Sequence, residues 1–186
     1  WISAENRELI ADFLRRRLMP GGLVYVSYKT LPGWAAMLPV RQIMVEHTRW
    51  MSAPGLSEVD RARAAVDFVR RIAELEPPFI RDNPALAKNI RELVDNPAEY
   101  LVHEYFVRDW HPMAFSDVAA MLEPAGLTFA GDARSHERMK GLQLGADLEA
   151  VLAEIPSDGF LEAVRDLMLA RRFRRDLWVR GGRPLS

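Results

Sequence analysis

A short segment combines a hydroxyl, an amine and an aromatic ring, and it is the best candidate for a binding site. The candidates come where an apolar run at 23–28 ends, and they are Tyr28, Lys29, Pro32, Gly33 and Trp34. Ligands of wound α/β sheets sit outside the carboxyl ends of the strands, so these side chains could line the substrate side of a pocket. The alternative is structural: Pro32 and Gly33 make a turn, and Trp34 anchors the next helix.

A second cluster combines His103, Glu104 and Tyr105, with His111 downstream. A zinc-protease helix needs a second His four residues after the first, and Val107 occupies that position. We therefore expect no metal site. His103 and Tyr105 could line a substrate pocket, or His103 could be a hydrogen-bonded interface residue, which is the favoured interpretation.

Arginine is concentrated near the end of the chain, at Arg171, Arg172, Arg174 and Arg175. A nucleic-acid footprint would add more basic residues and interleaved aromatic residues on one face, whereas Asp176 dilutes the charge here. A solvated or salt-bridged sheet edge is the favoured interpretation, and we expect no nucleic-acid partner.

The composition is that of a globular protein without a dominant charge. The 186 residues, 49% apolar and 27% charged, suit one domain or one and a half. The formal net charge of −1 gives no general attraction to nucleic acid or anionic lipid, and no apolar run reaches the ~18 residues of a membrane span. The absence of Cys excludes disulfides and thiolate metal sites. We expect a cytoplasmic protein with no membrane partner.

The elements that position these residues begin with one helix and one strand. Ser3 can cap a helix over roughly 4–18, and the glycines at 21–22 suit its end. The run 23–28 then predicts a strand that is buried on both faces, as in a parallel sheet.

The second half of the chain repeats this step and closes with a third strand. Ser116 is expected to open a helix that ends by Gly126, one or two residues early because of Pro124. Strands are expected at 127–130 and at 173–180, the latter as an edge strand with one wet face. Further helices are expected at roughly 35–51, 57–75, 84–95 and 98–106, and two or three more across 137–172.

Several of these segments resemble class I S-adenosylmethionine-dependent methyltransferases. The segment Leu18-Met-Pro-Gly-Gly-Leu-Val-Tyr-Val-Ser-Tyr28 resembles their fifth strand. Phe115-Ser-Asp-Val-Ala-Ala-Met-Leu-Glu-Pro-Ala-Gly-Leu-Thr-Phe129 resembles a later helix and strand, and Phe173-Arg-Arg-Asp-Leu-Trp-Val-Arg-Gly181 their antiparallel last strand. Leu31-Pro-Gly-Trp34 and Tyr100-Leu-Val-His-Glu-Tyr-Phe106 are similar to bacterial members that carry a methyltransferase regulatory domain.

The resemblance implies an α/β fold: three strands from the C-terminal half of a Rossmann-like methyltransferase sheet, with a large helical insertion. It implies a core helix and strand five in 1–34, a helical cap or regulatory insertion in 35–111, and the remaining core in 112–186. The implied cofactor is S-adenosylmethionine, bound mainly by a missing N-terminal part, with Trp1 as a possible contact. Because no glycine-rich cofactor turn is found here, we expect this fragment alone to be inactive.

The implied function is to contribute substrate-side and regulatory elements to methyl transfer, onto a protein or a small molecule. No catalytic residue is identified, and the expected substrate-side residues are then Tyr28, Lys29, Pro32, Gly33, Trp34, His103 and Tyr105. The helical insertion could be a lid, a regulatory site or the interface of a homodimer. The alternatives are a non-catalytic helical regulatory or interaction module, or an RNA-binding protein that uses the arginine run.

Overall fold

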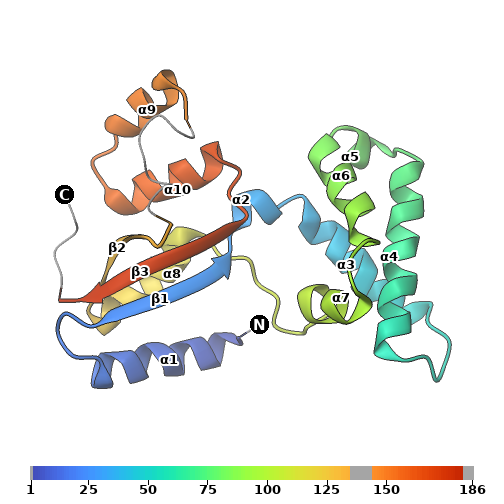
Figure 1. Ribbon diagram of the computed structural model, residues 1–186, viewed down its shortest axis with the longest axis horizontal. Coiled ribbons are helices and arrows are strands. Elements are labelled where there is room, and N and C mark those ends of the chain that lie inside the picture. Colours follow the sequence, from blue (N-terminus) through green and yellow to red (C-terminus); the bar gives the residue numbers. More distant parts are fainter. Residues whose placement is uncertain (1, 135–143, 182–186) are drawn as a thin grey trace. The chain divides into compact units, whose positions relative to one another are not determined.

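The computed structural model describes residues 2–134 and 144–181, which divide into two compact units. Residues 2–34 and 111–181 form what we call the sheet unit, and residues 35–110 form the helical unit (Figure 1). Trp1 and the part of the predicted helical segment at 137–143 lie outside the described residues.

The sheet unit contains three strands, β1 (Leu23–Lys29), β2 (Leu127–Asp132) and β3 (Phe173–Arg180), in the order β1-β3-β2. β3 is antiparallel to both neighbours. The three predicted strands therefore lie in one sheet, and the α/β fold is confirmed. The prediction that β3 is a wet edge strand is wrong, since it is central among the described strands and its alternate residues are buried.

β1 is more exposed than the sequence suggested. Leu23 and Tyr25 are 64% and 54% exposed, whereas Val24 and Val26 pack against the core on the opposite face. Within the described part of the chain one face of β1 is open, so the prediction of burial on both faces is wrong. The apolar run is explained by one core-facing row and one exposed row.

The core of the sheet unit lies between the strands and the helix α8 (Phe115–Leu122), which runs behind them in Figure 1. Three aromatic rings form its centre. The ring of Phe115 lies 5.0 Å from that of Phe129 and 5.8 Å from that of Trp178, between ring centroids. These contacts fix the register of α8 on the sheet.

The helices of the sheet unit begin and end largely where side-chain chemistry dictates. The Ser3 hydroxyl accepts from the Asn6 N–H at the start of α1 (Ala4–Arg17). Ser116 does not open α8, because Ala114 holds the cap position and its N–H donates to the Asp117 carboxylate, 3.0 Å away. The early end at Pro124 is confirmed by a 3-10 turn, η1 (Glu123–Ala125). The remaining helices are α2 (Leu31–Trp34), α9 (Ala146–Ala153) and α10 (Asp158–Met168).

The helical unit is organised around its longest helix. Its elements are α3 (Met37–Trp50), α4 (Glu58–Glu74), α5 (Pro78–Arg81), α6 (Pro84–Leu93) and α7 (Ala98–Tyr105). α4 packs against α3, α6 and α7, and the small side chains of Ala62 and Ala65 on its buried face allow this close approach. Met44 of α3 is fully buried. Apolar packing therefore holds this unit together.

Candidate functional site

The candidate residues at the end of β1 lie in a tight turn that continues into the single helical turn α2. Backbone groups of the segment before β3 bind this turn: the Gly33 N–H donates to the Arg171 carbonyl at 3.0 Å, and the Thr30 N–H to the Arg172 carbonyl at 3.0 Å. The Thr30 hydroxyl also donates to the Arg171 carbonyl. The turn is therefore held by its own unit through main-chain contacts.

Gly33 permits this close approach. A Cβ atom at this position would lie 2.6 Å from the Arg171 carbonyl oxygen, well inside van der Waals contact. The space beside the glycine is thus filled by the protein's own backbone. For that reason the turn does not fit a glycine-rich cofactor cradle, which needs open space at the glycine.

Trp34 and Lys29 lie at the two ends of the turn. Trp34 is buried, and its indole N–H donates to the Arg172 carbonyl at 2.9 Å. The Lys29 ammonium lies 5.1 Å and the Arg172 guanidinium 4.5 Å from the Trp34 ring centroid, in cation–π range. Pro32 is half-buried in α2. These contacts anchor Trp34 in the sheet unit, which agrees with the structural alternative. A role of Trp34 in substrate binding stays a prediction.

Tyr28 points away from this turn, into the buried face of the sheet. Its hydroxyl donates to the Asp176 carboxylate at 2.7 Å. Burial, and then the negative charge of Asp176, raise the pKa of Tyr28 far above its ordinary value. Tyr28 therefore remains a neutral hydrogen-bond donor and is unsuited to act as a general base near neutral pH.

Asp176 belongs to a network of buried charges on the core side of the sheet unit. The fully buried guanidinium of Arg174 donates from Nε to Asp176 at 2.9 Å. Its two terminal nitrogens donate to Asp166 and Glu162 of α10, at 2.8 and 2.7 Å. The arginine run is therefore salt-bridged, as the favoured interpretation held, but its paired members are inside the unit instead of at a solvated edge.

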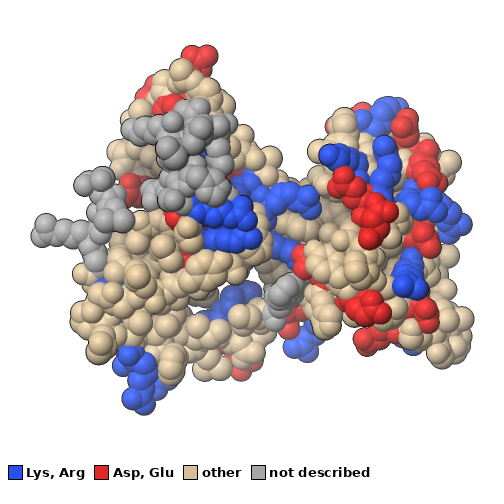
Figure 2. All heavy atoms as spheres, viewed as in Figure 1, with Lys and Arg blue, Asp and Glu red and all other residues tan. Residues whose placement is uncertain are grey.

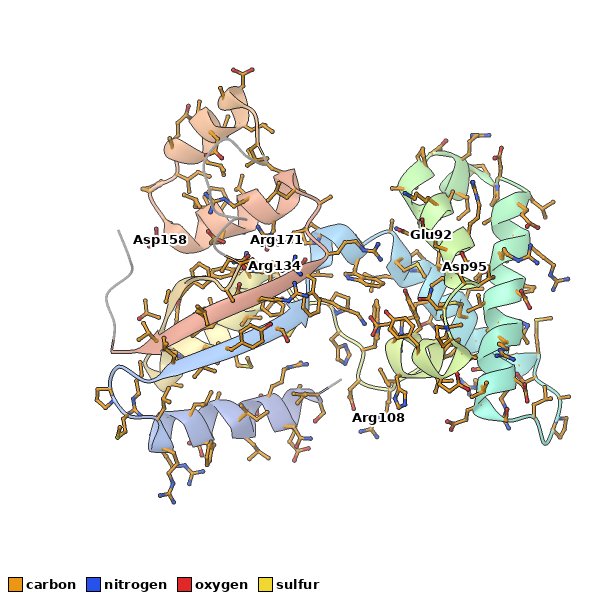
Figure 3. All side chains as sticks on the ribbon, in the orientation of Figure 1. Glu92, Asp95, Arg108, Arg134, Asp158 and Arg171 are labelled. Carbon is orange, nitrogen blue, oxygen red and sulfur yellow. The ribbon has the colours of Figure 1, made fainter. Side chains whose placement is uncertain are left out.

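Arg171 extends this network to the end of β2. Its terminal nitrogen donates to the Asp132 carboxylate at 2.6 Å, and its Nε lies 3.0 Å from an oxygen of Asp166. Figure 3 labels Arg171 between α10 and the strands, close to Arg134. Neither Asp132 nor Arg171 was singled out as a site residue from the sequence. The available signal was the alternation of Arg174, Asp176 and Trp178, which places charge and aromatic residues on one strand face.

The other two candidates belong to the helical unit. His103 is exposed on α7, whereas Tyr105 is buried and its carbonyl accepts from Arg41 Nε at 2.8 Å. The indole N–H of Trp110 donates to the Glu104 carbonyl at 2.7 Å. Side chains of α3 and residue 110 thereby tie down the end of α7. Among residues 2–134 and 144–181 no three His, Cys, Asp or Glu side chains are grouped to hold a metal ion.

Comparisons with known proteins agree with this fold. Residues 97–180 match the family model of a predicted methyltransferase regulatory domain. The structure of PKMT2 from Rickettsia typhi superposes on the whole chain with a TM-score of 0.78, and that of PKMT2 in complex with AdoHcy with 0.80, each at 23% sequence identity. The chain covers 34% and 35% of those two proteins. The Rossmann-like methyltransferase fold inferred from the sequence is confirmed.

Two curated relatives are also longer than this chain. An uncharacterized protein of Synechocystis sp. (strain ATCC 27184 / PCC 6803 / Kazusa) is 37% identical over 181 residues, which is 97% of this chain and 35% of that protein. An uncharacterized protein of Rickettsia prowazekii (strain Madrid E) is 28% identical over 109 residues, 56% of this chain and 41% of that protein. The chain thus spans well under half the length of these relatives.

Together these findings confirm the resemblance to methyltransferases with a regulatory domain, and they support a methyltransferase-associated role. No helix within the described ranges is long and apolar enough to cross a lipid bilayer.

Proposed function

We propose that this chain is the C-terminal part of an S-adenosylmethionine-dependent methyltransferase and supplies its acceptor-side and regulatory elements. The observation that carries the proposal is the match of residues 97–180 to a methyltransferase regulatory domain, on a chain with a methyltransferase-like fold. One of the structures with this fold holds AdoHcy, the product that remains when S-adenosylmethionine has given up its methyl group.

The open side of the sheet unit supports a larger sheet. β1 is an edge strand among those described, and its row with Leu23 and Tyr25 is exposed. Leu9 and Phe13 of α1 are 60% and 58% exposed. Exposed apolar rows of this size are unusual on a finished surface and fit burial against further protein. We assign that role to the cofactor-binding half of the methyltransferase.

Gly33, in the turn after β1, offers the cofactor no open cradle. The glycine that follows β1 is closed off by the Arg171 carbonyl, as described above. S-adenosylmethionine, which supplies an activated methyl group when bound, is therefore held mainly by residues outside this chain. This chain positions the acceptor through the turn from Lys29 to Trp34. Its buried charge network keeps Tyr28 neutral.

The helical unit would act as a cap that selects the acceptor, a protein or a small molecule, or as the surface of a homodimer. A cap is favoured because the chain leaves the sheet unit directly after α2 and re-enters it at residue 111. His103, exposed on α7, and Tyr105 belong to this unit and are its candidate acceptor contacts. A cytoplasmic location fits an enzyme that draws on S-adenosylmethionine.

The test is methyl transfer by the full-length protein from labelled S-adenosylmethionine onto a cell lysate. We expect Trp34→Ala to lower transfer about tenfold or more, because positioning of an acceptor is sensitive to small displacements. Tyr28→Phe should lower it less. Trp50→Ala is the matched control, since Trp50 is 70% exposed on α3. A folded parent protein that transfers no label would contradict the methyltransferase, and full activity of both site variants would show that the acceptor site lies elsewhere.

A further inference from the structure

Arg171 connects three elements that are far apart in the sequence. Its carbonyl accepts from Gly33 N–H and from the hydroxyl of Thr30, both in the turn after β1. Its side chain binds Asp132 at the end of β2 and Asp166 in α10. One residue therefore joins the candidate acceptor turn to the carboxyl end of another strand and to a helix.

Each partner of the Arg171 side chain is itself held in place. The second oxygen of Asp132 accepts from the Arg134 N–H at 2.8 Å. Asp166 also accepts from Arg174 at 2.8 Å, and its backbone carbonyl accepts from the Arg171 N–H at 2.9 Å. Arg171 and both carboxylates are buried. The side chain is thus fixed in one position, and so is the carbonyl to which the turn is attached.

The backbone at this point needs such support. Ala170, directly before Arg171, has a φ of 44°, in the left-handed region that residues with a Cβ rarely adopt. Such a conformation persists only where the surrounding structure over-determines it. The two ion pairs of Arg171 supply that constraint, and they orient its carbonyl toward Gly33 and Thr30.

We propose that Arg171 is a positioning residue for the methyl acceptor: by its pairing with Asp132 and Asp166 it fixes the turn from Lys29 to Trp34 at the carboxyl end of β1. The inference rests on the proposed function for the identity of the ligand, but not for the bracing itself. An arginine is required because one guanidinium pairs with two separate carboxylates: a terminal nitrogen donates to Asp132, and the ion pair with Asp166 lies at Nε. A lysine ammonium at the end of a flexible chain does not reproduce this.

The experiment compares Arg171→Lys and Asp132→Asn in the full-length protein. Arg165→Lys is the matched control, because Arg165 pairs with Glu162 in the same network at 2.6 Å. The first readout is hydrogen exchange of the peptide that covers residues 28–36, which contains the Thr30 and Gly33 amides. We expect its exchange to rise about tenfold in both test variants and to stay unchanged in the control. The Gly33 amide opens locally once the Arg171 carbonyl is released, and the Thr30 amide opens with the adjoining Arg172 carbonyl.

The second readout separates KM from kcat for the acceptor in the lysate fraction that is methylated. A displaced turn should raise KM about tenfold with kcat nearly unchanged. A merely structural defect would reduce the folded fraction, which lowers the apparent kcat and leaves KM as it is. Asp132→Asn retains an oxygen acceptor and a similar shape, so it provides a folded variant if Arg171→Lys does not fold.

Each result decides the inference. Unchanged exchange at 28–36 in a folded variant would overturn the bracing, and raised exchange with an unchanged KM would overturn the positioning role. If the parent protein transfers no methyl group, the proposed function has failed and the positioning of an acceptor falls with it. The exchange measurement would still establish in that case whether Arg171 holds the turn.

Discussion

The two units of this chain bury different kinds of side chain. In the helical unit the fully buried residues are apolar, such as Met44, Val66 and Ile90. In the sheet unit the fully buried residues include Arg174 and Asp176, next to the aromatic core. Apolar side chains fill most of the core of one unit, whereas the core of the other also contains a charge network.

The surfaces of the two units differ as well, and here the helical unit carries charges of both signs. Figure 2 shows side chains of both charges scattered over the helical unit. On the visible face of the sheet unit, uncharged residues cover the left part of the strands, and Lys and Arg side chains gather toward their right end. Both units also expose apolar side chains, such as Trp50 in the helical unit and Tyr25 in the sheet unit. In the sheet unit these form a row along the open face of β1, which fits burial against further protein.

The largest expected effect comes from breaking the charge network. Arg174→Met leaves the buried carboxylates of Asp166, Asp176 and Glu162 without their common partner, and should lower the free energy of unfolding of the sheet unit by about 3–5 kcal/mol. Hydrogen exchange of the β3 amides in the full-length protein measures this loss. Arg16→Met, at an exposed ion pair on α1, is the control. A loss below about 1 kcal/mol in Arg174→Met would show that the network contributes little.

The helical unit should be most sensitive to lost volume. Met44→Ala removes a fully buried side chain and should cost about 2–5 kcal/mol, from lost burial and the cavity that remains. Met51→Ala, at a position 61% exposed just after the same helix, should change the stability by less than about 0.5 kcal/mol. Amide exchange in α3 and α4 measures both. Equal effects of the two substitutions would contradict an apolar core at this site.

The two units should also respond oppositely to acid. Burial raises the pKa of Asp176 from 3.8 to about 6, against the effect of Arg174. Between these values the folded sheet unit binds a proton that the unfolded chain does not, so its stability rises as the pH falls from 6 toward 4. Burial, and then the charge of Arg71, lower the pKa of His47. The helical unit therefore loses stability as the pH falls below 6.5.

This contrast is measured by amide exchange at pH 7 and pH 5, corrected for the intrinsic exchange rate. Asp176→Asn should reduce the response of the sheet unit and leave a part from Asp166, whose pKa burial also raises. His47→Gln should remove the response assigned to the helical unit. If neither substitution changes the pH dependence of its unit, the two buried groups are not its cause.

The smallest effect is expected where a charge pair is exposed. Arg70 of α4 pairs with Glu74 one turn later on the surface of the helical unit. Because water screens such pairs, Arg70→Ala should change the unfolding free energy by about 0.5 kcal/mol or less, measured by denaturant titration. A loss of several kcal/mol here would remove the distinction between the buried and the exposed ion pairs.

Sequence patterns predicted the helical unit better than the charge network. The spacing of Ala65, Val69 and Ile72 on α4 predicts an amphipathic helix and no other element. Ser57 marks the start of this helix. The pattern of Arg174 and Asp176 is compatible with two structures, a strand at a solvated sheet edge or a buried strand whose charges are paired. Only the partners on α10 decide between these two structures. Those partners lie 8 to 14 positions away on another element, where no local periodicity indicates the contact.

The candidate site shows the same limit. Tyr28 to Trp34 were located from strand and turn signals, since a buried strand followed by Pro-Gly has a local signature. Arg171 was noticed only as a member of the arginine run and Asp132 not at all, because their pairing is a contact between positions 39 residues apart. The direction in which the Tyr28 hydroxyl points, toward Asp176, likewise depends on the central place of β3 in the sheet.

The most direct test of the account is calorimetric titration of S-adenosylmethionine into the full-length protein and into residues 1–186 alone. We predict one site per full-length molecule, with a dissociation constant of the order of micromolar, and no measurable binding by the isolated segment. Absence of binding to a folded full-length protein would contradict the methyltransferase assignment. Equal binding by both would contradict the placement of the cofactor site outside this chain.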